Sequence, residues 1–373
     1  RSSAASDVYK RQGIDNNLSL EGKRKEIQRS KYGVSENRSK LLPQINAIAG
    51  YSNNFDPPVS VTDGSSYGVP YNITQTLQHS ANAGLEMQMP LFNQTLYTSM
   101  SIAKVMEEIS RLSYGKARED VILQISKMYY LGQVTAEQIM LIKANITRLE
   151  ELRDITQAFF DNGMSMEVDL KRVNINLENL KVQYDNAQAM MKQQLNMLKY
   201  IMDYPAEKEI ALTPVNTDSI TTVALTGLSE NIYELQLSQS QVQLAERQKK
   251  IITNGYIPSL SLTGSWRYAA YTDKGYHWFH SGPSNQWFRS YGVGLTLRIP
   301  IFDGLDKTYK IKKAMIDIEN KRLAWEDARK NLQTQYLNAV NDLMNNQRNF
   351  KKQKDNYLLA EDVYAVTSDR YRE

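Results

Sequence analysis

The chain has 373 residues, of which 41% are hydrophobic, and its 45 basic and 41 acidic residues leave a formal net charge of +4. This mixed surface lacks the basic patch of a nucleic-acid-binding protein, so no nucleic-acid partner is expected. Cysteine is absent, which excludes disulfides, thiolate metal sites and a cysteine nucleophile. No run of about 18 apolar residues occurs, so the sequence predicts no transmembrane helix.

Residues 1–13 begin RSSAASDVYKRQ, a segment without the apolar centre of a signal peptide. We expect this segment to be an unstructured lead-in that is not native to the fold. It therefore takes no part in the predicted architecture.

Residues 14–40 are predicted to form a helix that ends before Pro43. An alternating apolar and polar strand follows Pro43 and reaches Tyr51. Residues 52–80 are rich in Ser, Asn, Gly and Pro and predict a long loop. A second strand follows and ends at Pro90, where a missing N–H is tolerated.

A very long helix is predicted from Asn93 to Asn162, a segment without proline that would reach on the order of 100 Å. Gly163 interrupts it, and a return helix runs from Met166 to Met202. Apolar residues in this return helix step by three or four, the spacing of a coiled coil, with an ordinary bundle helix as the alternative. The stripe consists of Val173, Leu177, Leu180, Tyr184, Ala187, Met191, Leu195 and Leu198.

Residues 204–227 are predicted to be a connecting, equatorial region beside the helices, because prolines and mixed charge interrupt the helical pattern there. The earlier order of elements then returns within residues 228–373. A helix over 228–254 precedes a strand that starts after Pro258, and a loop over 269–290 leads to a strand ending at Pro300. Another long helical run completes the chain.

An internal repeat explains this order. The phrase GLEMQMPLF at 84–92 returns as GLTLRIPIF at 294–302, an offset of 294 − 84 = 210 positions. The sequence therefore predicts two copies of one unit. The first copy spans 14–213, and the second, over 228–373, is expected to be truncated before its final helix.

The predicted strands alternate between apolar and polar residues. Leu85 and Leu297, for example, lie on the face opposite Glu86 and Arg298. Such alternation fits a soluble sheet over a core, but equally a membrane barrel with lipid outside and water inside. Strands of about 9 to 11 residues are long enough to cross a bilayer when tilted. The long loops at one end of each strand pair and the helices at the other favour the barrel.

Four strands cannot close a barrel, because small closed barrels need about eight. An open sheet edge in lipid would leave backbone groups unpaired, so the chain must combine with copies of itself. Two protomers would supply eight strands and three would supply twelve, and the residues alone leave this number open.

The sequence resembles the TolC-type outer-membrane efflux proteins, also called outer membrane factors. The strand phrases LLPQINAIAGY, YIPSLSLTGSW, AGLEMQMPLFN and VGLTLRIPIFDG carry the resemblance. The segment FFDNGMSMEVDLKRVNINLENLKVQYDNAQAMMKQQLNML resembles the helical turn and return helix of that family. The similarity covers about residues 14–373.

The resemblance implies an α+β membrane protein and a homotrimer. Each protomer would contribute four β-strands to a 12-stranded transmembrane β-barrel, joined to a long antiparallel α-helical coiled-coil barrel. It further implies an exit duct of a tripartite efflux or type I secretion system. The duct would conduct substrates passively from a periplasmic adaptor and an inner-membrane transporter to the exterior.

The implied location is the outer membrane of a Gram-negative bacterium, in contact with lipid, with the helical body in the periplasm. A signal peptide is not present in this chain, and the native protein is expected to carry one.

Three groups of candidate residues follow. The polar alternation predicts a barrel lumen lined by Glu86, Gln88, Thr296 and Arg298, and the duplicated phrase allows an ion pair between Glu86 and Arg298. The resemblance assigns the periplasmic tip and adaptor contact to Asp161, Asn162, Gly163, Ser165 and Asp169. The strand–helix transitions are assigned to Pro43, Pro90, Pro258 and Pro300. For Asp169 the alternative is that its charge simply offsets the positive end of a helix.

Aromatic residues around the second loop predict an interfacial girdle, with loop packing as the alternative. They are Trp266, Tyr268, Tyr276, Trp278, Trp287, Phe288 and Tyr291. His277 and His280 lie three apart without a third ligand nearby, so no metal site or other cofactor is expected. No catalytic constellation occurs, and the chain is not expected to be an enzyme. The alternative function is a non-transport coiled-coil scaffold or interaction protein of the cell envelope.

Overall fold

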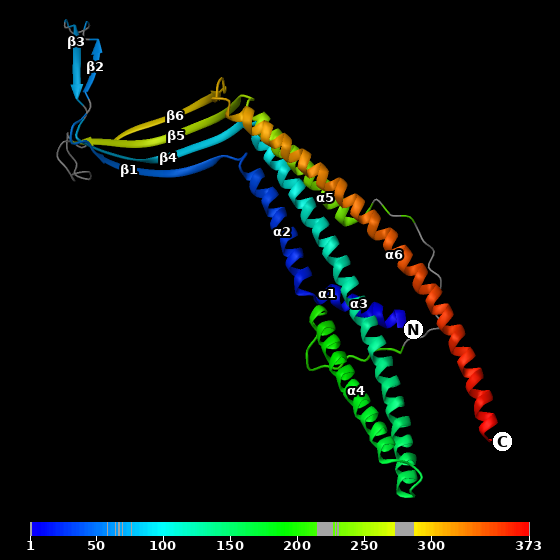
Figure 1. The fold of residues 1–373 in the computed structure, drawn as a ribbon. Helices are drawn as coiled ribbons and strands as arrows, with labels where there is room; N and C mark the ends of the chain where they lie inside the picture. Colours follow the sequence, from blue (N-terminus) through cyan, green and yellow to red (C-terminus); the bar gives the residue numbers. More distant parts are fainter. Residues whose placement is uncertain are drawn as a thin grey trace. The chain divides into compact units, whose positions relative to one another are not determined.

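The protein is described by a computed structural model that covers residues 2–57, 59–63, 65, 68, 70–75, 77–214, 227, 229, 231–272 and 287–372. The helices are α1 (Ser2–Asn16), α2 (Leu18–Ser39), α3 (Gln94–Asp161), α4 (Glu167–Ile201), α5 (Tyr233–Asn254) and α6 (Asp306–Arg372). The strands are β1 (Gln44–Asn53), β2 (Val59–Asp63), β3 (Tyr71–Gln75), β4 (His79–Phe92), β5 (Ser259–Thr272) and β6 (Trp287–Arg298). The fold is thus mostly helical with one four-stranded sheet and a separate hairpin (Figure 1).

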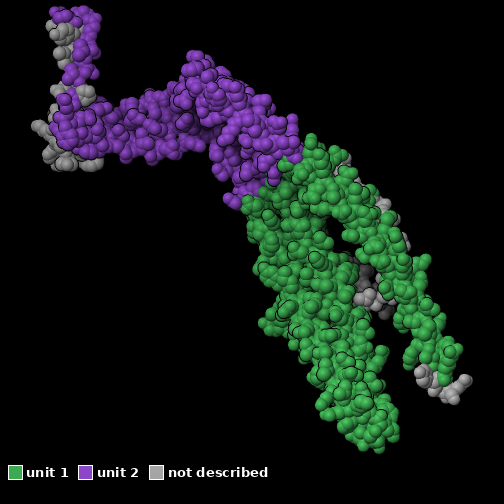
Figure 2. Space-filling model, in the orientation of Figure 1, with its two compact units in different colours: residues 1–28, 109–238, 324–373 green, residues 29–108, 239–323 purple. Residues whose placement is uncertain are grey.

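The chain divides into two compact units, coloured separately in Figure 2. Unit 1 comprises Arg1–Gln28, Ile109–Ser238 and Ala324–Glu373, and unit 2 comprises Arg29–Glu108 and Gln239–Leu323. Each unit therefore draws segments from both halves of the sequence. The boundaries of the two units differ from those of the two predicted copies, 14–213 and 228–373, because contacts within each unit join elements that are distant along the chain.

The sheet of unit 2 has the strand order β1-β4-β5-β6, and all its pairs are antiparallel (Figure 1). The predicted strands are confirmed, but β4, β5 and β6 run for 14, 14 and 12 residues and so exceed the expected length. β5 also extends to Thr272, inside the segment expected to be a loop. Contacts with neighbouring strands stabilise these longer strands. The alternation along one segment does not show which strands will pair with it, so it does not predict where each strand ends.

Two expectations for the first strand pair are wrong. The predicted loop over 52–80 contains the β2–β3 hairpin, in which Val61 faces Ile73. β4 does not stop at Pro90 but continues to Phe92, with a register irregularity between these two residues. An irregularity of this kind accommodates proline, which cannot donate a ladder hydrogen bond.

Unit 1 contains the predicted turn between two long helices. α3 and α4 begin and end within one residue of the expected bounds, Asn93 to Asn162 and Met166 to Met202. The two helices pack with α2 around a buried core of Leu20, Val121, Ile125, Leu198, Ile201 and Met202. Two stripe residues predicted from the heptad spacing, Leu177 and Leu198, are almost completely buried. None of the described helices is both apolar enough and long enough to cross a membrane.

The expectation of an unstructured lead-in over residues 1–13 is wrong, because α1 begins at Ser2. Tyr9 packs its ring 5.8 Å from that of Tyr129 and donates a hydrogen bond to the carbonyl of Ala211. Gly13 lies against Ile125 so closely that a Cβ atom there would overlap the isoleucine side chain. Tertiary contacts thus hold a helix that its weak local pattern did not predict.

Candidate functional site

The polar residues predicted to share a face of the sheet do so. Glu86 and Gln88 on β4 face Ser265 and Thr263 on β5, and these face Gly292 and Gly294 on β6. Thr296 and Arg298 follow two and four positions after Gly294, which puts them on the same side because side chains alternate along a strand. The four predicted lumen residues therefore lie on one polar face.

The opposite face of the sheet is apolar and exposed. Residues that face each other across the strands form rows on this face. One row contains Ile45, Met87 and Val293, and another contains Leu85, Trp266 and Tyr291. Leu295 and Leu297 lie further along β6 on the same face. Val293 is 80% exposed and Tyr291 is 77% exposed. A contiguous exposed apolar surface marks contact with a membrane or a protein partner. Among the predicted girdle residues, Tyr276 and Trp278 lie outside the described residues.

Glu86 forms an ion pair with Arg267 and not with Arg298. Nη2 of Arg267 donates to Oε1 of Glu86 across 2.6 Å. Arg298 faces Ser259, whereas Glu86 faces Ser265, and 265 − 259 gives 6 residues along β5. That separation is about 20 Å at the rise of a strand, so the expected pair within the chain is wrong. Alternation along β5 puts Arg267 on the polar face, but only the strand register reveals it as the partner of Glu86.

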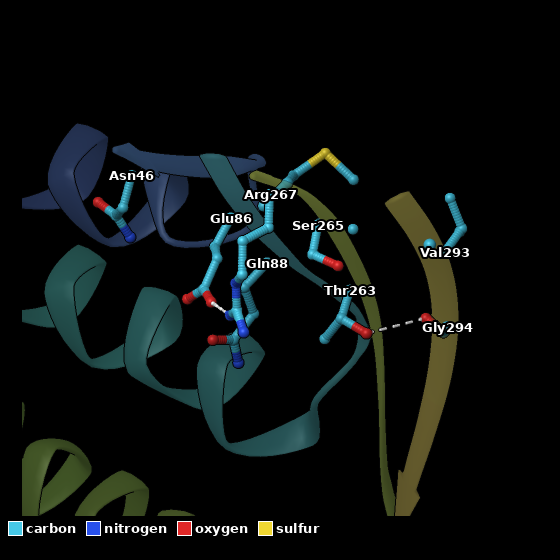
Figure 3. Close-up of a pocket in the computed structure, with 11 residues that line it drawn as sticks. Asn46, Glu86, Gln88, Thr263, Ser265, Arg267, Val293 and Gly294 are labelled. Atoms are coloured by element: carbon cyan, nitrogen blue, oxygen red, sulfur yellow. Dashed lines mark hydrogen bonds and ion pairs between the residues drawn. The ribbon is translucent and has the colours of Figure 1, made fainter. Parts of the chain in front are cut away.

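The ion pair borders a recess of about 480 Å³ on the polar face (Figure 3). Asn46, Gln88, Thr263 and Ser265 contribute amide and hydroxyl groups to it. The hydroxyl of Thr263 donates to the carbonyl of Gly294, as the dashed line in Figure 3 shows. On the β6 side of the recess, Gly292 and Gly294 contribute no side chains, and Val293 completes the lining. We call this the Glu86–Arg267 recess.

The turn between α3 and α4 closes as the glycine predicts. Gly163 has a φ of +74°, the left-handed region that favours glycine. Its N–H donates to the carbonyl of Phe160, and the N–H of Met164 donates to that of Phe159. This pair of hydrogen bonds is a Schellman motif, which satisfies the last carbonyls of α3. Ser165 donates back to the carbonyl of Thr156 across 3.4 Å.

The other predicted tip residues make local contacts. The side chain of Gln157 donates to Asp161 across 2.9 Å, and that of Asn162 donates to the carbonyl of Ala158 across 2.7 Å. Asp169 lies in the first turn of α4 and pairs with Arg172 at 3.5 Å. That position favours a carboxylate because it faces the positive end of the helix dipole. Asp169 thus has the position that the alternative reading describes, while its assignment to the tip stays a prediction.

Glu167, also in the first turn of α4, was not among the predicted tip residues. Its pKa is lowered below the ordinary value because the Lys171 ammonium donates a hydrogen bond to it across 2.7 Å.

Sequence reasoning missed an apolar surface at the turn. Met164 and Met166 are 74% and 75% exposed, and Phe159 and Val168 are also exposed. We call these four residues the apolar tip. Their signal was available in the segment FFDNGMSMEV, where large apolar residues bracket the glycine. The predicted set consisted of polar residues and Gly163, and it left these four apolar residues out.

Three of the four predicted strand–helix transitions lie where the prolines predict, and Pro90 is the exception. Pro43 and Pro258 immediately precede β1 and β5, and Pro300 follows the end of β6. Before α6, the Asp303 carboxylate accepts hydrogen bonds from the backbone N–H of Lys307 at 3.2 Å and from its ammonium at 3.0 Å. The same ammonium lies 4.9 Å from the ring centroid of Tyr256. Asp303 therefore caps the start of α6, and Lys307 joins α6 to the segment that follows α5.

The Asp303 contact predicts a pH dependence of stability. The Lys307 ammonium lowers the pKa of Asp303, so the folded state binds the proton less readily than the unfolded state. The stabilisation is complete above the ordinary aspartate pKa of about 3.9 and is lost as the pH falls through the lowered folded-state pKa. We expect Asp303→Asn to reduce the melting temperature near pH 6 but to have little effect near pH 2. Thermal melting of both proteins from pH 2 to 7 measures this, and an equal loss at both ends would contradict it.

The histidines form no metal site within the described part of the chain. His79 is buried, and its Nδ1 lies 2.9 Å from the hydroxyl of Tyr51. His277 and His280 lie outside the described residues. No group of three or more His, Cys, Asp or Glu side chains gathers among the residues that the structure describes.

Several known outer membrane proteins are similar to this chain in sequence. Outer membrane protein TolC of Vibrio cholerae is 21% identical over 319 residues, covering 83% of this chain and 66% of that protein. The probable efflux pump outer membrane protein TtgC of Pseudomonas putida is 23% identical over 337 residues, covering 85% and 66%. This chain thus spans just under two thirds of the length of these relatives.

A solved structure of CusC shares the fold, with a TM-score of 0.72 and 16% identity over 93% of this chain and 79% of that one. A family model described as outer membrane efflux protein matches residues 11–202 and 225–373, most of the sequence. The alternating sheet, the long helices joined at Gly163 and this match lead to one conclusion. The chain belongs to the outer membrane efflux protein family.

Proposed function

We propose that this chain is one protomer of an exit duct in the outer membrane of a Gram-negative bacterium. The duct conducts substrates passively to the exterior. A periplasmic adaptor joins it to an inner-membrane transporter in a tripartite efflux or type I secretion system. The helical body lies in the periplasm, and the two halves of the chain are copies of one structural unit.

The exposed apolar face of the sheet is the observation that carries this proposal. A soluble sheet buries its apolar side against a core, yet Val293 and Tyr291 are among the most exposed large apolar side chains of the sheet. Contact with lipid would cover this face and leave Glu86, Gln88, Thr296 and Arg298 toward water. These four residues would then line the lumen. A coiled-coil scaffold in solution would leave the same apolar side uncovered.

The edges of the sheet support assembly from several chains. β1 and β6 are the outer strands, and each pairs on one side only within the described strands. In lipid their free backbone groups require partners, which β6 of one protomer and β1 of the next would supply. We propose a homotrimer, in which three sets of four strands close a 12-stranded barrel.

The test measures the detergent-extracted full-length protein in two ways. Its mass is expected to equal three protomers, and its insertion into planar bilayers is expected to give a discrete single-channel conductance. The chain has no cysteine, so variants with one cysteine introduced on β1 and one on β6 will also form intermolecular disulfides where the two edges meet. A monomer without conductance would reject the duct and favour the envelope scaffold.

The tip surface supports the adaptor proposal. We propose that the adaptor binds Asp161, Asn162, Gly163, Ser165 and Asp169 together with the apolar tip. Exposed methionines suit this role because their flexible side chains adapt to a partner. Around them, polar residues provide the rim that surrounds an apolar contact in many interfaces.

Charging the apolar tip is expected to uncouple the duct from its pump. The double variant Met164→Glu, Met166→Glu should lower export of a fluorescent dye from cells about tenfold or more, because a charge buried in an interface is costly. Conductance of the purified protein in bilayers should remain unchanged. Met190→Glu on α4 is the matched control, since Met190 is 52% exposed and lies about 36 Å along the helix from Met166. Unimpaired export by the double variant would contradict adaptor binding at this surface.

A further inference from the structure

Charged side chains are rare on the sheet. Within its four described strands, the polar face carries Glu86, Arg267 and Arg298, and only the first two lie side by side. Arg289, by register, lies on the apolar face with Tyr268. The middle of the polar face therefore holds a single pair of opposite charges beside the Glu86–Arg267 recess.

The ion pair uses only part of the hydrogen-bonding capacity of Glu86 and Arg267. One guanidinium nitrogen of Arg267 contacts one carboxylate oxygen of Glu86, whereas a bidentate pair would use two of each. Among the described residues, Nε of Arg267 is buried and has no hydrogen-bond partner. The two side chains are 42% and 46% exposed, so the pair contributes little stability and readily exchanges for other partners.

We infer that the Glu86–Arg267 recess is a binding subsite for zwitterionic solutes, which present a carboxylate to Arg267 and an ammonium to Glu86. A solute with one charge would be attracted by one residue and repelled by its neighbour. A dipolar solute satisfies both, and Asn46, Gln88, Thr263 and Ser265 offer hydrogen bonds around it. The volume of about 480 Å³ lies within the usual range of ligand pockets.

This inference rests on the proposed function, since it requires the polar face to line a conducting lumen. The experiment uses the assembled full-length protein in planar bilayers. The probe is trialanine, which is zwitterionic at pH 7, and the comparison probe is the same peptide with both termini capped. Trialanine is expected to interrupt the single-channel current, and the capped peptide is not. Losing either charged partner should weaken the block about tenfold.

Ion selectivity supplies an independent readout. Arg267→Gln leaves Glu86 uncompensated and should shift the reversal potential toward cation preference, while Glu86→Gln should shift it toward anion preference. The double variant should restore the wild-type selectivity but not the trialanine block. Arg267→Lys keeps the charge without the planar fork, so it should preserve the selectivity and weaken the block.

Two further variants guard against misfolding and indirect effects. A Cβ atom on Gly292 would meet no atom within 4 Å, so Gly292→Val can fold, and it fills the recess without changing charge. It should abolish the block and retain the selectivity. The matched control is the exposed Arg322–Glu246 pair at 2.8 Å, where Arg322→Gln should change neither measurement.

The outcomes separate the subsite from the duct. Equal block by the capped peptide, or block unaffected by Arg267→Gln and Gly292→Val, would overturn the subsite while the conductance still supports the duct. A wild-type protein that neither trimerises nor conducts would overturn the duct and, with it, this inference.

Discussion

Replacing Gly84 with valine is expected to prevent the pairing of β4 with β5 and so to abolish assembly of the sheet. A Cβ atom on Gly84 would overlap the carbonyl oxygen of Trp266 and lie 2.8 Å from Cα of Arg267. These are backbone atoms of the facing strand, which cannot turn aside as a flexible side chain would. Overpacking commonly costs about 1–3 kcal/mol, and more where a backbone must move.

The loss would be large because β4 and β5 are the two central strands. Gly84→Ala and Gly84→Val should show progressively less trimer by size-exclusion chromatography in detergent. Gly292→Ala is the matched control, because its Cβ atom enters open space on an edge strand of the same sheet. Normal assembly of Gly84→Val would mean that the strands pair in another register.

Truncating Ile125 is expected to be the most damaging single change in the helical core of unit 1. Its side chain is 0% exposed and packs with Leu20, Leu198 and Met202. Ile125→Ala removes buried methyl groups and leaves a cavity, which typically costs about 2–5 kcal/mol. The neighbouring segments are distant in sequence and cannot easily collapse onto the gap.

Thermal and denaturant unfolding followed by circular dichroism measure this loss. Leu123→Ala is the matched control, since Leu123 lies on the same helix but is 67% exposed. Its effect should stay within about 0.5 kcal/mol. If both variants lost the same stability, the helical core would have to lie elsewhere.

Local patterns predicted the elements of this protein with useful accuracy. The proline-free run and Gly163 predicted α3, its left-handed turn and α4, because helix breakers and the left-handed conformation of glycine are local properties of the chain. Alternation predicted the two faces of the sheet, because side chains on a strand change sides at every residue. The family resemblance, carried by motifs such as PIFDG, is confirmed by the family match.

The elements that depend on tertiary contacts were not predicted from the sequence. α1 has a weak local signal and is held by Tyr129 and Ile125, which lie more than 100 residues away. The β2–β3 hairpin had a signal in Val59 and Val61, which alternate with Ser60 and Thr62, but loop composition outweighed it. Neither segment could be judged without knowing what faces it.

The amino-acid sequence by itself determined the class of elements, the polar and apolar faces and the family, because each follows from the order of residues along a segment. Only the tertiary structure decided that Glu86 pairs with Arg267 and that the two border a recess opposite Gly292 and Gly294. The physical reason is register. Sliding one strand along its neighbour leaves every local pattern intact at each two-residue step, yet it changes which charges meet.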